Sequence, residues 1–294
     1  MELRVLRYFW TIAEEGSISK AASLLHITQP TLSRQLMNLE EELGVQLFIR
    51  EKKRLILTEA GMYLKDRAQE IISLTDKTEQ DFEDQKKQLF SGTLSIGCVE
   101  ANNSKVLADF LKKFLLAYPQ VNFNLFSGTG DDISEKLDKG LLDIGILVEP
   151  VQTEKYECLV FPEKERWGIL VEKSFPLAQK QAVSPKELRE LPLMCSARPE
   201  VQRLLEQWSG VPSGDMTIVG TYNLIFNVIS LVENRVGAAL MIEGAASYLK
   251  SEHTRFIPLS PEVSTSCVVV WKRNRTLSPV THEFIRKLTH AFQA

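Results

Sequence analysis

Cysteine is scarce in this chain, and its spacing argues against two common kinds of site. Only four cysteines occur among 294 residues: Cys98, Cys158, Cys195 and Cys267. They stand far apart, with no CxxC pair and no spacing typical of metal ligands. We therefore expect four reduced thiols, no metal centre and a cytoplasmic location.

Long apolar runs and an excess of one charge are also missing. No apolar run approaches the roughly 18 residues of a membrane span, and the acidic, amphipathic N-terminus is unlike a secretory signal. Charged residues make up 25% and the net charge is −3, so contact with nucleic acid has to come from a local basic patch. The length and the 44% hydrophobic content allow two domains or three.

Signatures of catalysis are absent as well. The sequence contains no GxSxG and no phosphate-binding loop. Its histidines are too scattered to indicate one site: His26, His253, His282 and His290. We expect no catalytic residue, no cofactor and no enzymatic activity.

The first 44 residues predict three amphipathic helices. Apolar residues recur every three or four positions, which predicts one buried face on each helix. These faces are Leu3, Leu6, Phe9, Ile12 and Ala13; Ile18, Ala21, Ala22 and Leu25; and Leu32, Leu36, Leu39 and Leu43. Ser17 and Thr28 are suited to cap the second and third helices, and Pro30 fits a first turn.

The second and third helices are joined by a very short linker, which predicts a helix-turn-helix. At about 100° per residue, Pro30, Ser33, Arg34 and Met37 lie opposite the leucine stripe. The third helix therefore presents its N-terminal half outward, as a recognition helix does in the major groove. On periodicity alone, a small helical domain with no DNA role is equally consistent.

The segment GVQLFIREKKRLILTEAG follows and predicts a β-hairpin. Strands at 47–49 and 55–57 flank a tip, residues 50–54, with four basic side chains and one acid. A charged hairpin tip is usually a solvated turn. Directly after a helix-turn-helix it indicates a wing that reaches along the DNA backbone or into the minor groove.

Residues 6–50, followed by LTEAG, resemble the N-terminus of LysR-type transcriptional regulators over the whole winged-helix unit. The resemblance implies that part of the third helix sits at the groove and that the wing contacts DNA. Glutamine can read adenine and arginine can pair with phosphate or guanine, and each base contact contributes roughly 1–3 kcal/mol of discrimination. Many members have a glycine-containing wing tip where this chain has REKKR. The implied DNA-binding residues are Gln29, Pro30, Thr31, Ser33, Arg34, Arg50, Lys52, Lys53 and Arg54.

A proline-free stretch, residues 59–89, predicts one long helix. A heptad-like seam with polar interruptions runs along it: Leu64, Ala68, Ile71, Thr75, Thr78, Phe82, Gln85 and Leu89. An exposed helix of about 30 residues does not hold an apolar stripe in water unaided. We favour pairing with a second copy, as in the linker helix of the resembled family, and packing on the same chain is the alternative.

Alternating strands and helices fill residues 92–294 and predict a mostly parallel sheet. A second set of strands is expected to begin at ERWGILVE, and TSCVVVW precedes a final helix. The arrangement resembles the effector-binding region of the same family, which is similar to type 2 periplasmic solute-binding proteins. That resemblance implies one α/β subdomain of about 92–161 and 267–294 and a second of about 162–266. In LVENRVGAAL we expect a helix to end near Asn234, since asparagine tolerates a left-handed turn.

The expected organisation is therefore a multi-domain protein. A winged helix-turn-helix domain, residues 1–58, precedes the linker helix, residues 59–89. An effector-binding domain, residues 92–294, completes the chain.

Ligands of open α/β sheets bind beyond the carboxyl ends of the strands, which gathers the loops EANNS, SGTG, SARP and GTYN around one cleft. Helix N-termini there offer backbone N–H groups to an anion, so an anionic small molecule such as an organic acid is favoured. The candidate side chains are Asn102, Asn103, Ser104, Ser127, Thr129, Ser196, Arg198, Thr221 and Asn223. The alternative for each is a helix cap or a turn former.

The leading interpretation is a transcription regulator that binds duplex DNA as a homodimer or a dimer of dimers. A small-molecule effector would bias its contacts with DNA or RNA polymerase through different affinities for two states. A solute-binding module or an enzyme with a vestigial DNA-binding domain is the alternative. Redox sensing is disfavoured because no second cysteine lies near Cys195.

Overall fold

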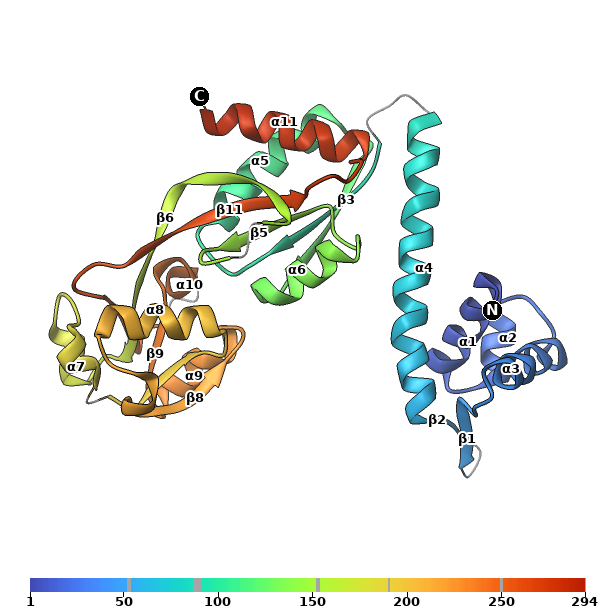
Figure 1. The fold of residues 1–294 in the computed structure, drawn as a ribbon, viewed down its shortest axis with the longest axis horizontal. Helices are drawn as coiled ribbons and strands as arrows, with labels where there is room; N and C mark the ends of the chain where they lie inside the picture. Colours follow the sequence, from blue (N-terminus) through green and yellow to red (C-terminus); the bar gives the residue numbers. More distant parts are fainter. Residues whose placement is uncertain (52–53, 87–90, 152–153, 190, 249–250, 294) are drawn as a thin grey trace. The chain divides into compact units, whose positions relative to one another are not determined.

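The structure is a computed structural model that describes residues 1–51, 54–86, 91–151, 154–189, 191–248 and 251–293. Its backbone contacts divide the chain into two units, Met1–Lys86 and Lys87–Ala294 (Figure 1). Lys52 and Lys53 of the wing tip and Leu89 of the seam lie outside the described residues. Within the described part, no helix has the length and apolar character to cross a membrane.

Short helices build the core of the first unit: α1 (Leu3–Glu15), α2 (Ile18–Leu24) and α3 (Gln29–Leu43). Ser17 caps α2 by accepting from the N–H of Lys20, and Thr28 caps α3 by accepting from the N–H of Thr31. Both caps confirm the prediction. His26 lies in the turn between α2 and α3 with a φ of 54°, a left-handed conformation that histidine adopts more readily than most residues.

The predicted helix faces pack together in one core. Its buried side chains include Leu6, Phe9, Ile12, Ala21, Ala22, Leu32, Leu36 and Leu39. Leu43, which we predicted to be buried, is 39% exposed. The reason is its position, because α3 ends there at Gly44, whose φ of 69° turns the chain away.

A hairpin and a long helix complete the unit: β1 (Phe48–Glu51), β2 (Arg54–Leu57) and α4 (Glu59–Lys86). The carboxylate of Glu40 on α3 accepts the N–H groups of Leu47 and Phe48 at 2.7 and 3.2 Å, which fixes the base of the hairpin. A Cβ on Gly61 would lie 2.1 Å from the carbonyl oxygen of Leu47. Glycine therefore lets α4 start this close to the hairpin.

The long helix α4 has two kinds of surface. Leu64 and Ala68 are buried in the core of the first unit, and Lys65 pairs with Glu14 of α1 at 2.8 Å. At Leu64 and Ala68, the predicted seam therefore packs on its own chain, which was the alternative to pairing with a second copy. Further along the helix, Ile71 is 41% exposed and Phe82 is 62% exposed.

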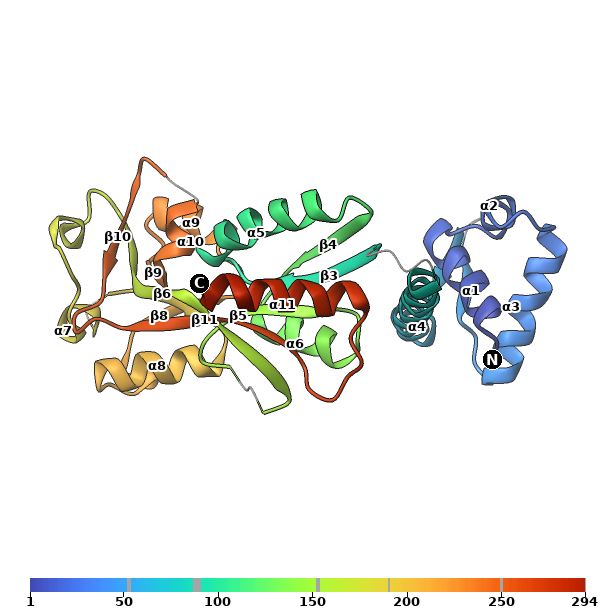
Figure 2. The same ribbon diagram turned by 90° about the horizontal axis from the view of Figure 1, so that it is seen from above.

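The second unit begins with a parallel set of strands. Its elements are β3 (Gly92–Cys98), α5 (Asn103–Ala117), β4 (Val121–Ser127), α6 (Gly130–Asp138), β5 (Ile144–Val148), β6 (Tyr156–Glu172), β11 (Ser264–Lys272) and α11 (Pro279–Gln293). The strand order is β4-β3-β5-β11-β6, with β3 parallel to β4 and β5 and with β11 antiparallel to β5 and β6. Helices α5 and α11 cover one face and α6 covers the other (Figures 1 and 2).

Both faces of this sheet are apolar, as a sheet between two helix layers requires. Side chains alternate along β5, so Ile146 joins the core beneath α5 and α11 while Leu147 joins Ile133 of α6. Phe114 of α5 and Phe284 of α11 meet edge to face, with ring centroids 5.1 Å apart. The predicted strand-helix alternation of this region is confirmed.

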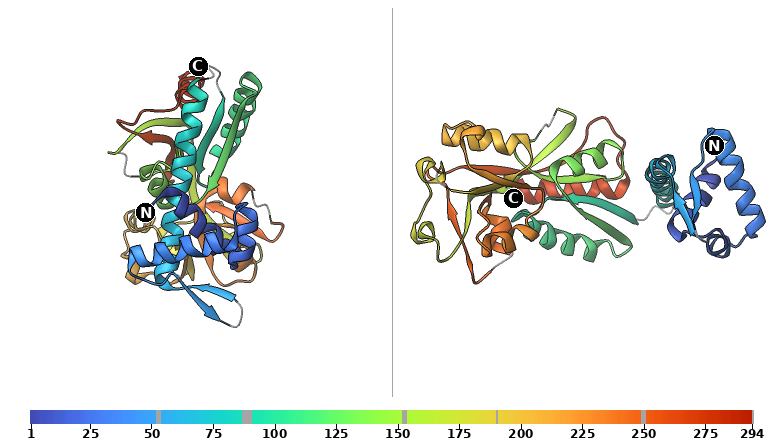
Figure 3. Two further views of the ribbon diagram at one scale, coloured as in Figure 1. Left: turned by 90° about the vertical axis from the view of Figure 1, so that its right-hand side faces the viewer. Right: turned by 90° about the horizontal axis from the view of Figure 1, so that it is seen from below.

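The sheet continues into a second set of strands in the order β6-β9-β7-β8, with β10 paired to β6. Its elements are η1 (Pro176–Gln179), α7 (Pro185–Arg189), β7 (Leu193–Ser196), α8 (Pro199–Ser209), η2 (Ser213–Asp215), β8 (Ile218–Tyr222), α9 (Phe226–Glu233), β9 (Ala238–Ile242), α10 (Glu243–Tyr248) and β10 (Thr254–Pro258). Helix α8 lies on one side of these strands and α9 with α10 on the other (Figures 2 and 3).

Three details differ from the sequence prediction. Strand β6 is one continuous strand of 17 residues that pairs with β11 at its start and with β9 and β10 at its end, whereas we expected a strand to begin near residue 165. Strand β10 was not predicted. Helix α9 ends at Glu233 as expected, but Arg235, not Asn234, has the positive φ, 61° against −86°.

Candidate functional site

One face of the N-terminal half of α3 stands clear of the core. Gln29, Pro30, Thr31 and Arg34 are exposed, and Ser33 is half-buried. The hydroxyl of Thr31 lies 2.7 Å from the hydroxyl of Thr28, the N-cap residue of α3. This contact holds the first turn of α3 in place. The predicted groove residues thus lie on one accessible part of the helix, opposite the buried leucines.

The hairpin of β1 and β2 projects from the helices of the first unit (Figure 3). Its antiparallel register pairs Arg50 with Leu55 and Glu51 with Arg54. Arg50 and Arg54 therefore stand at the tip end of the two strands. The structure adds nothing on Lys52 and Lys53, so their contacts stay predictions.

The second unit contains a cavity of about 100 Å³ at the carboxyl ends of β3, β4, β5, β7, β8 and β9. Both sets of strands contribute to its wall, as the rule for ligand sites in open α/β sheets predicts. The residues that line it are Val99, Glu100, Gly128, Thr129, Gly130, Val148, Trp167, Ser196, Arg198, Val201, Tyr222, Asn223, Leu224, Ile225, Met241 and Ile242. The wall is therefore mostly apolar with a small number of polar groups, as is usual for small-molecule sites.

The structure brings part of the predicted effector set together at this cavity. Thr129, Ser196, Arg198 and Asn223 line it, whereas Asn102, Asn103, Ser104, Ser127 and Thr221 do not. Four of these five residues have a local reason. Asn103 is 4% exposed, Ser104 is hydrogen-bonded to Cys98, and Ser127 and Thr221 are exposed on edge strands. The binding roles of all nine stay predictions.

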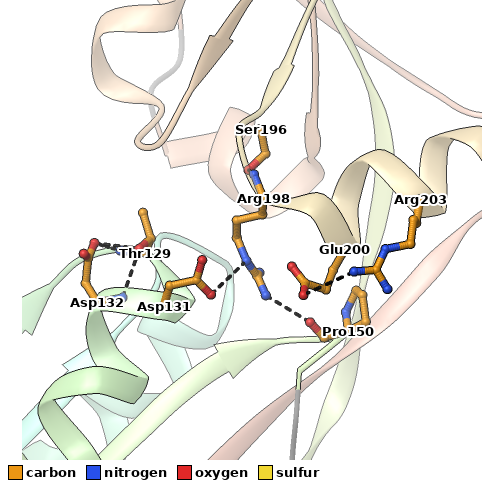
Figure 4. Close-up of polar contacts among 8 residues, drawn as sticks. All are labelled: Thr129, Asp131, Asp132, Pro150, Ser196, Arg198, Glu200 and Arg203. Atoms are coloured by element: carbon orange, nitrogen blue, oxygen red, sulfur yellow. Dashed lines mark hydrogen bonds and ion pairs between the residues drawn. The ribbon is translucent and has the colours of Figure 1, made fainter. Parts of the chain in front are cut away.

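Arg198 reaches across the cleft from the N-cap position of α8 (Figure 4). Its Nη2 donates to the carbonyl oxygen of Pro150 at 3.0 Å, and its Nε lies 3.8 Å from Oδ1 of Asp131 at the start of α6. The side chain is 16% exposed, and among the described residues its buried Nε has no hydrogen-bond partner. A buried donor without a partner is unfavourable, so Nε is a place where an acceptor is missing.

Two helix N-termini at the cleft are already capped by glutamates from elsewhere in the chain. Oε2 of Glu100 accepts the N–H of Ile225, at the start of α9, at 3.1 Å. Oε1 of Glu165 accepts the N–H of Asn102, at the start of α5, at 2.6 Å. Helix dipoles there are therefore compensated by carboxylates of the protein.

The remaining two helix N-termini carry their own acids. Thr129 and Asp132 form a reciprocal capping box at α6, where Asp131 adds a second carboxylate. Helix α8 begins at Pro199, which has no N–H, and Glu200 follows in its first turn. The free N–H groups on which we based the preference for an anionic ligand are thus engaged or shielded by acid.

Sequence reasoning missed several groups of the wall. Glu100 lies in the loop EANNS, where we chose the asparagines and the serine instead. Trp167 comes from the middle of β6 and donates its indole N–H to the hydroxyl of Thr265 at 3.1 Å. Tyr222 donates its hydroxyl to the carbonyl of Leu240, and burial raises its pKa. Only Glu100 had a local signal, its place directly after the first strand.

A buried glutamate occupies the crossing between the two sets of strands. Glu165 is 2% exposed, and its second oxygen accepts the N–H of Gly244, at the start of α10, at 3.1 Å. A Cβ on Gly244 would lie 2.4 Å from the backbone nitrogen of Asn102. Burial raises the pKa of Glu165, and the two N–H bonds oppose that rise.

The thiols are poor candidates for reactivity. All four cysteines are free, and Cys98, Cys195 and Cys267 are buried. Burial raises the pKa of Cys98 to about 11 and also raises that of Cys267. The thiolate, which is the reactive form, is disfavoured in such surroundings.

The two units together define a class of protein. One unit is a winged helix-turn-helix with an exposed recognition helix, and the other is an α/β unit with a cavity at the carboxyl ends of its strands, so the class is that of ligand-responsive DNA-binding regulators. Residues 3–62 match the family described as bacterial regulatory helix-turn-helix protein, lysR family, and residues 87–293 match the LysR substrate binding domain. The chain therefore belongs to the LysR family: it is a DNA-binding transcription regulator controlled by an effector bound in its α/β domain.

Similar proteins support the same assignment. The HTH-type transcriptional regulator YtlI of Bacillus subtilis is 32% identical over 216 residues, 71% of this chain and 69% of that protein. A probable RuBisCO transcriptional regulator of Emiliania huxleyi is 30% identical over 250 residues, 82% of this chain and 79% of that protein. The fold is shared with full-length CbnR complexed with its target DNA, with a TM-score of 0.76, 21% identity and coverage of 99% and 100% of the two chains.

Proposed function

We propose that α3 reads base edges in the major groove and that the wing anchors the unit on the DNA backbone. Gln29, Ser33 and Arg34 carry the base contacts, while Pro30 and Thr31 shape and hold the first turn. Arg50, Lys52, Lys53 and Arg54 carry the wing contacts. The observation that supports this most is the exposed face of the N-terminal half of α3, opposite the buried Leu32, Leu36 and Leu39.

Self-association through α4 follows from its exposed apolar residues. Tyr63, Ile71, Leu74 and Phe82 are 67%, 41%, 39% and 62% exposed, and an apolar surface of this kind is typical of an interface. Pairing two copies along α4 gives two recognition helices and hence an operator with two half-sites. We keep the predicted division into residues 1–58, 59–89 and 92–294, with subdomains of about 92–161 with 267–294 and of about 162–266.

The cleft binds its effector and does not transform it, in keeping with a family of transcription regulators. Binding there changes the relative arrangement of the two subdomains, because the wall of the cavity comes from both. The change alters how a dimer, or a dimer of dimers, holds its operator and contacts RNA polymerase. The free thiols and the DNA-binding role favour a cytoplasmic location.

A binding assay with the DNA that lies upstream of the protein's own gene tests the proposed contacts of α3. The double variant Ser33→Ala, Arg34→Ala is expected to weaken specific binding by about 10- to 100-fold per lost base contact and to flatten the dependence of affinity on salt. Its stability should change little, because neither side chain belongs to the buried core. Arg203→Ala, which removes an exposed arginine from the other unit, is the matched control. Unchanged operator affinity in the double variant would show that α3 is not the reading element.

A further inference from the structure

The charges around the effector cleft differ from those of an anion site. Among the described residues that line the cavity, the charged side chains are Glu100 and Arg198. The guanidinium of Arg198 already faces the carboxylate of Asp131 at 3.8 Å. An anionic ligand would therefore meet one shared cation and two carboxylates.

A neighbouring cavity makes the surroundings more acidic still. It adjoins the cleft through Gly130 and Arg198, and its wall includes Asp131, Glu135, Asp138, Glu154 and Glu200. Of these acids, Asp131 pairs with Arg198, whereas Glu135, Asp138 and Glu200 pair with Lys139, Lys155 and Arg203. An anion that binds at Arg198 would have to overcome the repulsion of Asp131.

Glu100 keeps acceptor capacity that the protein does not use. One of its oxygens accepts the N–H of Ile225, whereas a carboxylate has about four acceptor positions. The group is half-buried in a mostly apolar wall that includes Trp167 and Val148. A protonated amine beside it would form a charge-assisted hydrogen bond in partly desolvated surroundings.

We propose that the cleft takes a small aliphatic molecule that carries a protonated amino group, such as an amino-acid zwitterion. The amine pairs with Glu100, the apolar body lies against Trp167 and Val148, and an acceptor on the ligand meets the guanidinium of Arg198. This proposal rests on the cleft being the effector site. It replaces the expectation of a purely anionic ligand, because carboxylates accept N–H groups at the starts of α5, α6 and α9, and Glu200 lies in the first turn of α8.

A matched set of probes tests the charge preference directly. L-valine, isobutylamine and isovalerate share one branched apolar body and carry an amine with a carboxylate, an amine alone and a carboxylate alone. Isothermal titration calorimetry on the full chain is expected to detect L-valine and isobutylamine and to find isovalerate at least tenfold weaker than L-valine. Tighter binding of isovalerate than of either amine overturns the proposal, and so does absence of binding by all three probes.

A charge-removing variant provides a second test. Glu100→Gln is expected to weaken L-valine binding at least tenfold, since hydrogen bonds to charged groups are among the strong ones. Glu200→Gln, which changes an acid of the neighbouring cavity, should bind L-valine as the unchanged chain does. Equal loss in both variants, or no loss in Glu100→Gln, overturns the assignment of the amine to Glu100. Operator binding measured on the same preparations separates failure of this proposal from failure of the proposed function.

Discussion

Replacing Glu165 with glutamine tests the reasoning about the crossing between the subdomains. Its two oxygens accept the N–H groups of Asn102 and Gly244 at 2.6 and 3.1 Å, and the residue is 2% exposed. Glutamine has one acceptor oxygen, so its amide NH₂ would face one of these N–H donors. Leaving a buried donor unpaired costs about 1–3 kcal/mol, which lowers the melting temperature of a domain of this size by about 2–12 °C.

The pH dependence gives this prediction a sign. Burial raises the pKa of Glu165 in the folded state, so between its unfolded and folded values the native protein binds more protons than the unfolded chain. Its contribution to stability is complete below the unfolded pKa and is lost as pH rises through the folded pKa. Glu165→Gln lacks this titration. The free-energy difference between the unchanged chain and the variant should therefore fall as pH rises through that window.

Urea unfolding followed by tryptophan fluorescence at several pH values measures both effects. Glu163→Gln is the control, because that glutamate lies on the same strand and is exposed, so its replacement should stay within about 0.5 kcal/mol. Equal stability of Glu165→Gln and the unchanged chain would refute the structural role of the two N–H bonds. A free-energy difference that does not vary with pH would refute the raised pKa.

Two further substitutions test the first unit. Leu32→Ala removes a side chain that is 0% exposed and should lower the free energy of unfolding by about 2–5 kcal/mol. The loss would appear as a lower melting temperature and weaker operator binding. Met37→Ala, on the exposed face of α3, is the control and should leave stability nearly unchanged. Phe82→Glu places a charge on the exposed apolar surface of α4 and should shift the sedimentation coefficient from that of a dimer toward that of a monomer. Leu116→Glu, at another exposed site, is the control and should leave the dimer intact. A dimer that persists in Phe82→Glu would argue against pairing through that part of α4.

The winged helix could be predicted well because its signals are local. A cap acts on a backbone group three residues away, as Thr28 does on Thr31, and a buried helix face repeats every three or four residues. The seam of α4 was harder. Leu64 and Phe82 fit the same heptad pattern, yet the first is buried in its own unit and the second is exposed, because the spacing of a stripe does not identify the surface that covers it.

A cavity lies where we predicted the effector cleft, and part of the predicted residue set lines it. The rule that ligands bind at the carboxyl ends of strands located it, and Arg198 was found because its loop, SARP, lies at the end of β7. The first half of β6 was missed because Pro162 and exposed charged residues such as Glu163 interrupt the apolar pattern of a strand. The observed crossing strand pairs with β11 at its start and with β9 and β10 at its end, contacts that no local pattern reveals.

The expectation of an anionic ligand was based on free helix N–H groups, and the engagement of those groups has a general physical reason. A helix N-terminus attracts an anion when its N–H groups lack partners, and the partner need not be near in the chain. Glu100 caps a helix that begins 125 residues later, and Glu165 caps one that begins 63 residues earlier. With those N–H groups engaged, the electrostatics of the cleft depend on Glu100, Arg198 and Asp131, the charged groups on which our proposal of an amine-bearing ligand rests.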